Sequence, residues 1–125
     1  MLIRIFFIAF FINLLYEIVH SFLYKTCLEA SFKNYVYLII KGAVFDGFFI
    51  TLIYLISSIF PNNFQILVFL SVNLLFAYFW EVYSLKKKKW EYSHKMPLFL
   101  SVGITPFIQL ALTGIIAITL QNRIP

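Results

Sequence analysis

The chain has 125 residues, of which 62% are hydrophobic and only 12% are charged, and it carries a formal net charge of +5. Soluble domains contain about 25% charged residues, so this composition excludes an ordinary water-soluble domain and predicts a single domain that is solvated by lipid. The lone cysteine, Cys27, excludes a disulfide within the chain and a metal site built from cysteines, and we expect it to be an unreactive thiol.

Four apolar segments follow one another along the chain, and each is about as long as the roughly 20 residues that a helix needs to cross a bilayer. We predict membrane-spanning helices at residues 2–24, 40–60, 64–85 and 97–120. The second helix could begin as early as Tyr35. The predicted fold is an all-α, four-helix transmembrane bundle with short connections, in one domain that covers the whole chain.

The first segment begins like a secretory signal, with Arg4 followed by an apolar run. A signal peptide would end in small residues where it is cleaved, but Asn13, Tyr16 and Glu17 occupy that region. We therefore expect this segment to remain in the protein as a permanent helix.

The connections between the segments contain turn residues and lysines. Residues 27–37 predict an interfacial turn or amphipathic piece, and Phe60–Asn63 predict a tight turn because Pro and Asn end one helix and begin the next. Lysines surround the first and third connections but not the second: Lys25, Lys33, Lys41, Lys86, Lys87, Lys88, Lys89 and Lys95. The positive-inside rule places both lysine-rich connections in the cytoplasm, so we predict a multi-pass protein of the cytoplasmic membrane with both termini outside (N-out/C-out).

The run KKKKWEY at residues 86–92 fits this topology. Its lysines would anchor the helix end, and Trp90 and Tyr92 would lie in the interfacial aromatic belt. Each basic residue near the surface would also attract anionic lipid by about 1 kcal/mol. Since topology accounts for the positive charge, we expect membrane lipids, and no nucleic acid, as partners.

Each predicted helix carries one amide or hydroxyl side chain near the middle of the bilayer, judged from a helix rise of about 1.5 Å per residue. These residues are Asn13, Thr51, Asn73 and Gln109. Buried amides in lipid form hydrogen bonds with neighbouring helices. The favoured interpretation is that these side chains hold the bundle together, and the alternative is that they contact a substrate.

The ionisable residues collect at a different depth, nearer the cytoplasmic ends of the helices. Glu17 and His20 are in the first segment, Asp46 is in the second and Glu81 is in the third. Consecutive helices run in opposite directions, so these residues reach one common layer. A charge in hydrocarbon costs about 2.5 to 3.5 kcal/mol, so we expect Glu17 to pair with His20 three residues later.

Helical spacing gives each segment a polar stripe that can turn inward. In the first segment, four side chains fall within an arc of about 60°: Asn13, Glu17, His20 and Tyr24. In the third segment, Asn73 and Trp80 share a stripe that has Glu81 at its margin. We predict that these stripes enclose a polar pocket near the cytoplasmic leaflet.

The candidate site combines these residues. Its chemically active core is predicted to be Glu17, His20, Asp46 and Glu81, and its substrate contacts are predicted to be Asn13, Tyr24, Asn73, Trp80 and Gln109. In an enzyme, His20 would act as a general base that Glu17 orients, and Asp46 or Glu81 would be the acid. In a transporter, the carboxylates would couple ions or protons, and Pro106 would break the fourth helix. The favoured interpretation of Pro106 is instead a tolerated kink in which Thr105 satisfies the backbone.

A metal site is a further possibility, because Glu17-x-x-His20 recurs as Glu91-x-x-His94 and four-helix carboxylate metal sites use two such motifs. Glu91 follows the lysine run and His94 precedes Pro97. The second motif is therefore expected in the interface rather than inside the bundle. We assign no metal ligands, and the sequence identifies no cofactor.

Three functions are compatible with these features. The first is binding, and processing or movement, of a lipid-like or small amphiphilic substrate, which is the default expectation for ionisable residues inside a membrane. The second is an ion- or proton-coupled small transporter that acts as a homodimer. The third is a non-catalytic accessory subunit of a larger membrane complex, in which Ala43-x-x-x-Gly47 would dock against the partner.

Overall fold

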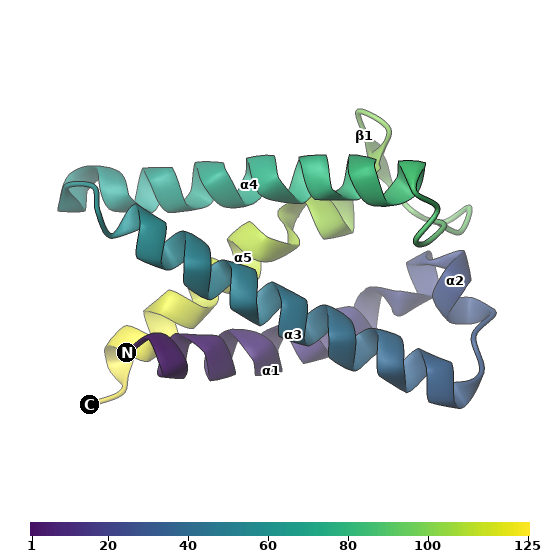
Figure 1. Cartoon of the computed structure of the whole chain (residues 1–125), viewed down its shortest axis with the longest axis horizontal. Coiled ribbons are helices and arrows are strands. Elements are labelled where there is room, and N and C mark those ends of the chain that lie inside the picture. Colours follow the sequence, from purple (N-terminus) through teal and green to yellow (C-terminus); the bar gives the residue numbers. More distant parts are fainter.

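The computed structural model describes residues 1–125, and nearly all of its regular structure is helical (Figure 1). In chain order the elements are α1 (Leu2–His20), the 3-10 helix η1 (Ser21–Leu23), α2 (Lys25–Leu28), α3 (Phe32–Ser57), α4 (Asn62–Lys86), β1 (Leu98–Phe99), β2 (Val102–Gly103) and α5 (Ile104–Arg123). Four helical segments are long and apolar enough to cross a membrane: α1 with η1, α3, α4 and α5. The predicted helical class and the four long helices are thus confirmed.

Helix α3 begins at Phe32 rather than at residue 40. Ser31 has an extended backbone, and its side chain accepts a hydrogen bond from the backbone N–H of Asn34 at 3.3 Å. This arrangement is an N-cap, which supplies a partner to a backbone donor that the helix itself leaves free. The segment before residue 40, whose mixed composition predicts a connection, is therefore the first part of a longer helix.

Helix α5 begins at Ile104 rather than at residue 97. The residues before it form a small antiparallel hairpin in which Leu98 pairs with Gly103 and Phe99 pairs with Val102. The apolar composition of this segment predicts a continuation of the helix, but its backbone instead turns back on itself. The fourth long helix is consequently shorter at its start than predicted.

The two residues of the hairpin turn have a backbone conformation that is unfavourable for their residue types. Leu100 and Ser101 have φ angles of 50° and 68°, in the left-handed region that the commonest two-residue hairpin turns require. Each residue other than glycine in this region costs about 1–2 kcal/mol. Because neither position carries Gly or Asn, the sequence gives no local signal for the turn.

Pro106 does not break α5. It is the third residue of the helix, after Ile104 and Thr105. Backbone N–H groups in the first turn have no partner within the helix, so a proline there removes no hydrogen bond. Neither a kink nor an interruption therefore occurs inside the helix at Pro106, because the helix starts later than residue 97.

The two ends of the bundle differ. The two chain termini lie close together at one end, to which the turn between α3 and α4 also belongs, and we call it the terminal end (Figure 1). Helix α2 and the β1–β2 hairpin lie at the other end, which we call the α2 end. Helices α3 and α4 diverge from their shared turn toward the α2 end, while α5 contacts both α1 and α4.

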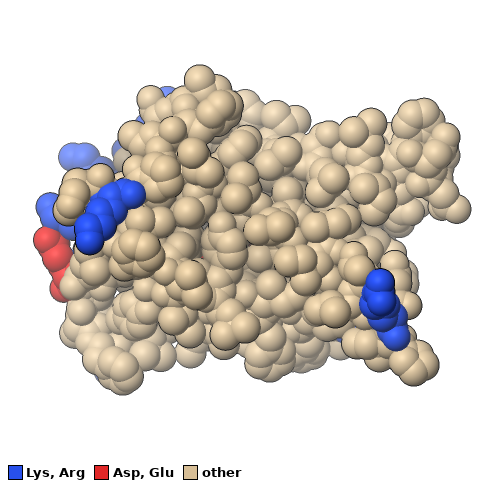
Figure 2. Space-filling model, turned by 180° about the vertical axis from the view of Figure 1, so that it is seen from behind, with Lys and Arg blue, Asp and Glu red and all other residues tan.

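The outer surface is apolar between the two ends. Phenylalanine, leucine and isoleucine side chains on all four long helices are exposed. Figure 2 shows lysine and arginine side chains near the ends of one face and a broad uncharged region between them. An exposed apolar surface of this extent is unusual for a soluble monomer, and it accompanies four helices of membrane-spanning length.

Small residues bring α3 close to α1. A Cβ atom built on Gly47 would lie 3.3 Å from the backbone nitrogen of Phe10 and 3.3 Å from the backbone oxygen of Phe6. Ala43, one turn earlier, is fully buried. The Ala43-x-x-x-Gly47 motif therefore packs two helices of the same chain, whereas the sequence suggested it as a docking surface for a partner.

We expect Gly47→Leu to lower the free energy of unfolding by about 1–3 kcal/mol, because the new side chain meets the backbone of α1 and not a movable side chain. Thermal unfolding in a mild detergent measures this change. The matched control is Val44→Leu on the same helix, at an exposed position, which should stay within about 0.5 kcal/mol of the parent. Equal stability of the two variants would contradict the close approach of α1 and α3.

Candidate functional site

The side-chain amide of Gln109 connects three helices at the α2 end. Its Nε2 atom in α5 lies 2.8 Å from Asp46 Oδ2 in α3, 2.9 Å from Glu17 Oε1 in α1 and 3.0 Å from Asn13 Oδ1, also in α1. An amide nitrogen has only two protons to donate, so at least one of them is shared between acceptors. The contact therefore draws two carboxyl groups and an amide oxygen around one donor.

Glu17 and Asp46 each present one carboxyl oxygen to the same nitrogen, Gln109 Nε2. Two ionised carboxylates that share a site repel each other, so a single proton on the pair lowers its energy. Space for the Glu17 carboxyl is left by Gly42, where a Cβ atom would lie 3.2 Å from Glu17 Oε1. The lack of a side chain at residue 42 thus admits the acidic pair.

The predicted pair of Glu17 and His20 is present. His20 Nε2 lies 3.2 Å from Glu17 Oε2, and His20 Nδ1 lies 3.1 Å from the hydroxyl of Thr105 at the start of α5. Both ring nitrogens of His20 thus have partners, and the Thr105 hydroxyl also donates to Met96 Sδ at 3.4 Å. The Tyr16 hydroxyl donates to the backbone oxygen of Thr105 at 2.6 Å, so α1 holds the first turn of α5 in two places.

Glu81 forms a second acidic centre on α4. Its Oε2 accepts hydrogen bonds from Trp90 Nε1 at 3.1 Å and from the Tyr92 hydroxyl at 2.6 Å. The Tyr92 oxygen in turn accepts a hydrogen bond from the backbone N–H of Gly103 at 3.0 Å. Burial raises the pKa of Tyr92, and the nearby charge of Glu81 raises it further, so the hydroxyl keeps the proton that it donates.

The interfacial position of Trp90 and Tyr92 stays a prediction, but their polar contacts lie within the fold. Both side chains are only partly exposed and turn inward to Glu81. The loop is fixed by backbone hydrogen bonds to the segment after α1, from Lys25 N–H to the Glu91 oxygen at 2.9 Å and from Ser93 N–H to the Leu23 oxygen at 2.7 Å. These long-range contacts have no signature in the local sequence.

Tyr24 is not part of the first helix, contrary to the predicted boundary. Helix α1 ends at His20, and Tyr24 has an extended backbone that forms an isolated bridge with Tyr92. Its ring nevertheless packs edge-on against His20 at 5.3 Å and against Trp90 at 6.2 Å. Burial raises the pKa of Tyr24, and the charge of Glu81 adds to this effect, so the phenol is neutral.

A cavity of about 400 Å³ separates the two acidic centres, and we call it the α2-end cavity. Its wall is formed by Glu17, Tyr24, Thr26, Cys27, Leu38, Lys41, Gly42, Phe45, Asp46, Ala77, Trp80, Glu81, Lys89, Trp90, Pro106, Gln109 and Leu110. All four long helices and both lysine-bearing connections contribute to it. The exposed side chains of Lys41 and Lys89 mark its mouth, whereas Asp46 and Glu81 are only 8% and 5% exposed.

Six of the nine predicted site residues line the cavity: Glu17, Tyr24, Asp46, Trp80, Glu81 and Gln109. His20 lies behind Glu17, and Asn13 lies behind Gln109. Asn73 is fully buried in α4, where its amide nitrogen donates to the backbone oxygen of Phe69 at 2.8 Å and its Oδ1 has no partner. The structure therefore does not bring Asn73 to the polar groups of the other helices.

Several residues of the cavity wall are missing from the sequence-based site. Phe45 stacks on Trp80 at 4.8 Å between ring centroids, and Lys89 places its Nζ 4.5 Å from the Trp80 ring centroid. Phe45 is one of 16 phenylalanines, so its type alone carries no signal. Lys89 belongs to a run of four lysines of which only this one lines the cavity.

The second Glu-x-x-His motif lies outside the bundle. Glu91 is 64% exposed and its carboxylate is 3.6 Å from Lys25 Nζ, and His94 is exposed. No group of three or more His, Cys, Asp or Glu side chains is arranged to hold a metal ion. Cys27 lines the cavity, but burial raises the pKa of its thiol, which lowers the thiolate fraction that nucleophilic attack requires.

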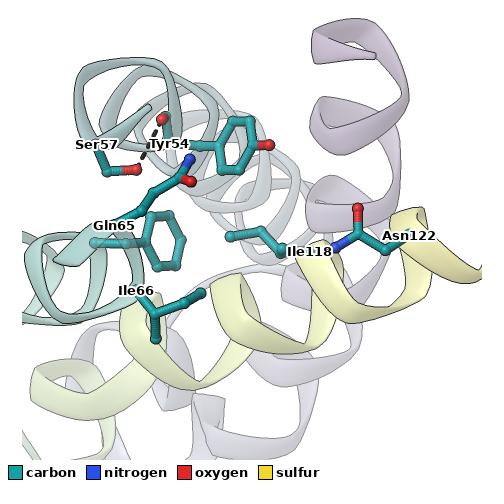
Figure 3. A pocket seen from close by; sticks show the side chains of 7 residues that line it. Tyr54, Ser57, Gln65, Ile66, Ile118 and Asn122 are labelled. Carbon is teal, nitrogen blue, oxygen red and sulfur yellow. Dashed lines mark hydrogen bonds between the residues drawn. The ribbon is translucent and has the colours of Figure 1, made fainter. Parts of the chain in front are cut away.

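A second, smaller pocket of about 100 Å³ lies at the terminal end (Figure 3). It is lined by Tyr54, Ser57, Gln65, Ile66, Phe69, Ile118 and Asn122. The Ser57 hydroxyl does not point into free space for a ligand, because it donates to the backbone oxygen of Tyr54 at 2.8 Å. This pocket contains no carboxylate, imidazole or amine, so the α2-end cavity is the candidate functional site.

The fold and the cavity define a class of protein: an all-helical chain with four candidate membrane spans and an internal polar cavity. No known protein family matches the sequence, and no curated protein or solved structure is significantly similar to it. Function must therefore be inferred from the geometry of the cavity.

We expect Gln109→Leu to lower the free energy of unfolding by about 2–3 kcal/mol, because buried acceptors on α1 and α3 lose their donor. The control is Gln121→Leu on the same helix, since Gln121 is also buried but its Oε1 has no partner. Gln121→Leu should leave the free energy of unfolding unchanged or raise it. Thermal unfolding of both proteins in the same detergent gives the comparison, and a loss of stability at residue 121 as large as at residue 109 would contradict it.

Proposed function

We propose that this chain is a multi-pass membrane protein whose α2-end cavity binds a lipid-like or small amphiphilic molecule and moves or processes it. The observation that supports this most strongly is the cavity itself, which holds Glu17, Asp46 and Glu81 beside aromatic and aliphatic side chains. Ligand sites are mostly apolar cavities of roughly 300–1,000 Å³ with a few convergent polar groups. The carboxyl groups would contact the polar head of such a molecule, and the aromatic and aliphatic side chains would contact its apolar tail.

The orientation that we propose places the α2 end in the cytoplasm and both termini outside. Lys25, Lys33, Lys41, Lys86, Lys87, Lys88, Lys89 and Lys95 all belong to the segments around the α2 end. Only Arg4 and Arg123 lie near the terminal end, where Arg4 donates to the backbone oxygen of Ile124 at 3.2 Å. The excess of lysine favours the cytoplasmic side, and the cavity then faces the cytoplasmic leaflet.

Access from the membrane is supported by the lining of the α2-end cavity, to which both α3 and α4 contribute side chains. Leu38, Lys41 and Phe45 line the cavity from α3, and Trp80 lines it from α4. A molecule at the headgroup level would enter between these two helices with its polar end toward the carboxyl groups. Its tail would remain beside the exposed apolar surface of α3 and α4.

The contacts favour binding or movement over acid–base catalysis by His20. The imidazole does not line the cavity, and both of its nitrogens already have partners in Glu17 and Thr105. The groups that a ligand meets are carboxyl groups. His20 would act on a ligand only through Glu17, whose carboxyl it positions.

A second candidate function is ion- or proton-coupled transport by a dimer of this chain. It is supported by the donor that Glu17 and Asp46 share, Gln109 Nε2, because two carboxylates at one site repel each other and favour binding a proton. A ligand that separates this pair would change its proton content. The accessory-subunit alternative is weakened, because the small-residue motif at Ala43 and Gly47 packs inside the chain.

The orientation is tested by labelling with a membrane-impermeant maleimide after Cys27→Ser removes the native thiol. We expect Asn63→Cys, at the exposed start of α4, to react in intact cells. Lys87→Cys, at the end of α4, should react only after the cells are permeabilised. The reverse pattern would invert the proposed topology.

Ligand binding is tested by filling the cavity. Ala77 is 4% exposed and lines the cavity from α4, so Ala77→Phe should occupy the ligand's volume. We expect the parent protein, purified in mild detergent, to retain an amphiphile that mass spectrometry detects, and we expect Ala77→Phe to lose at least about nine-tenths of it, equivalent to about 1.4 kcal/mol of binding. Leu75→Phe on the exposed side of the same helix is the control and should retain it. Equal retention by all three proteins would argue against the cavity as the binding site.

A further inference from the structure

We infer that the head group bound in the α2-end cavity is an organic ammonium, and that the side chain of Lys89 occupies part of its place when no ligand is bound. This inference rests on the proposed function and adds a substrate class to it. Three features of the cavity carry it: unpartnered carboxyl oxygens, aromatic faces, and an ammonium group of the chain itself on one of those faces.

Two buried carboxyl groups each present an oxygen that the chain leaves free. Asp46 Oδ2 is bonded to Gln109, and Glu81 Oε2 is bonded to Trp90 and Tyr92. The hydrogen bonds of the chain do not use Asp46 Oδ1 or Glu81 Oε1, and both residues line the cavity. A carboxylate oxygen that faces a cavity can accept a hydrogen bond from a ligand, and a cationic donor makes the strongest hydrogen bonds to carboxylates.

Aromatic rings complete the wall between these two acids. Tyr24, Phe45, Trp80 and Trp90 all line the cavity. The faces of aromatic rings carry partial negative charge and attract ammonium groups, with tryptophan the most favourable. A cavity that combines aromatic rings with carboxylates is suited to a cation and repels an anion.

The ammonium group of Lys89 already lies over an aromatic ring of this wall. Its Nζ lies 4.5 Å from the centroid of the Trp80 ring and 5.1 Å from that of Tyr83. Phe45 stacks on Trp80 with 4.8 Å between the ring centroids and covers part of the ring. Lys89 and a bound ligand would therefore compete for the part of the Trp80 ring that Phe45 leaves open. An incoming ammonium group would displace the lysine side chain, which is exposed and free to move into solvent.

The test uses the intrinsic fluorescence of the protein, because both of its two tryptophans, Trp80 and Trp90, line the cavity. The full chain in a non-ionic detergent is titrated with hexylammonium chloride, hexanol and sodium hexanesulfonate, which share a tail and differ in head charge. We expect a saturable change with the ammonium compound and no saturable change with the sulfonate. Methylammonium chloride then shows whether a tail is needed, which separates a membrane amphiphile from a soluble cation.

The role of Lys89 is tested with Lys89→Gln and a charge-matched control, Lys87→Gln, which is exposed in the same lysine run and does not line the cavity. Removing the lysine from the Trp80 face should tighten binding of hexylammonium about threefold to tenfold. The control removes the same charge from the surface, where salt screens it, and should change binding less than about twofold. Both positions are exposed, so both variants are expected to fold.

The outcomes separate the two proposals. Saturable binding of the sulfonate that equals that of the ammonium compound would overturn the ammonium assignment and leave the proposed amphiphile site intact. Equal effects of Lys89→Gln and Lys87→Gln would overturn the assignment of Lys89 to the ligand's place. If none of the probes changes the fluorescence of the folded protein, the proposed function itself fails.

Discussion

The amide of Gln109 is the interaction on which the arrangement of the helices depends. It holds the carboxyl groups of Glu17 and Asp46, from two other helices, on a single nitrogen. In the membrane setting proposed for this chain, apolar side chains gain little by moving from lipid into the protein interior, so packing and polar contacts fix the helix positions. Buried carboxyl groups are tolerated only with partners. The contacts of Gln109 therefore fix the position of α5 relative to α1 and α3.

The two acidic centres are built by different means, and this difference creates the cavity. Glu17 and Asp46 are satisfied by side chains of neighbouring helices, whereas Glu81 is satisfied by Trp90 and Tyr92 from a loop that folds back over the bundle. Helix α4 thus needs no polar contact with α3 at this level, and the two helices can diverge (Figure 1). The space between them is closed by the loop at the α2 end and walled by aromatic rings, which gives an acidic interior beneath an exposed rim of lysines.

The terminal end is organised differently. Its core is formed by apolar residues, among them Ile5, Ala9, Ile50 and Phe69, all fully buried. Phe69 packs onto Gly114 so closely that a Cβ atom there would lie 2.7 Å from its ring. The polar contacts between α1 and α5 end at Asn13 and Thr113, whose hydroxyl donates to Asn13 Oδ1 at 3.1 Å. The polar interior therefore extends to the α2 end, and the apolar core separates it from the terminal end.

The helical class, the four long helices and the Glu17–His20 pair could all be predicted from the sequence, because apolar length and the spacing of residues along a helix are local properties. The sequence also indicated that acids from distant segments share one end of the bundle, since consecutive helices alternate in direction. The choice of polar partners, in contrast, is set by the folded chain. Gln109 reaches Glu17 and Asp46 while Asn73 stays within its own helix, and the loop after α4 turns inward to Glu81. The rotation of a helix about its axis and the path of a loop depend on contacts between residues far apart in the chain, and the local sequence does not encode them.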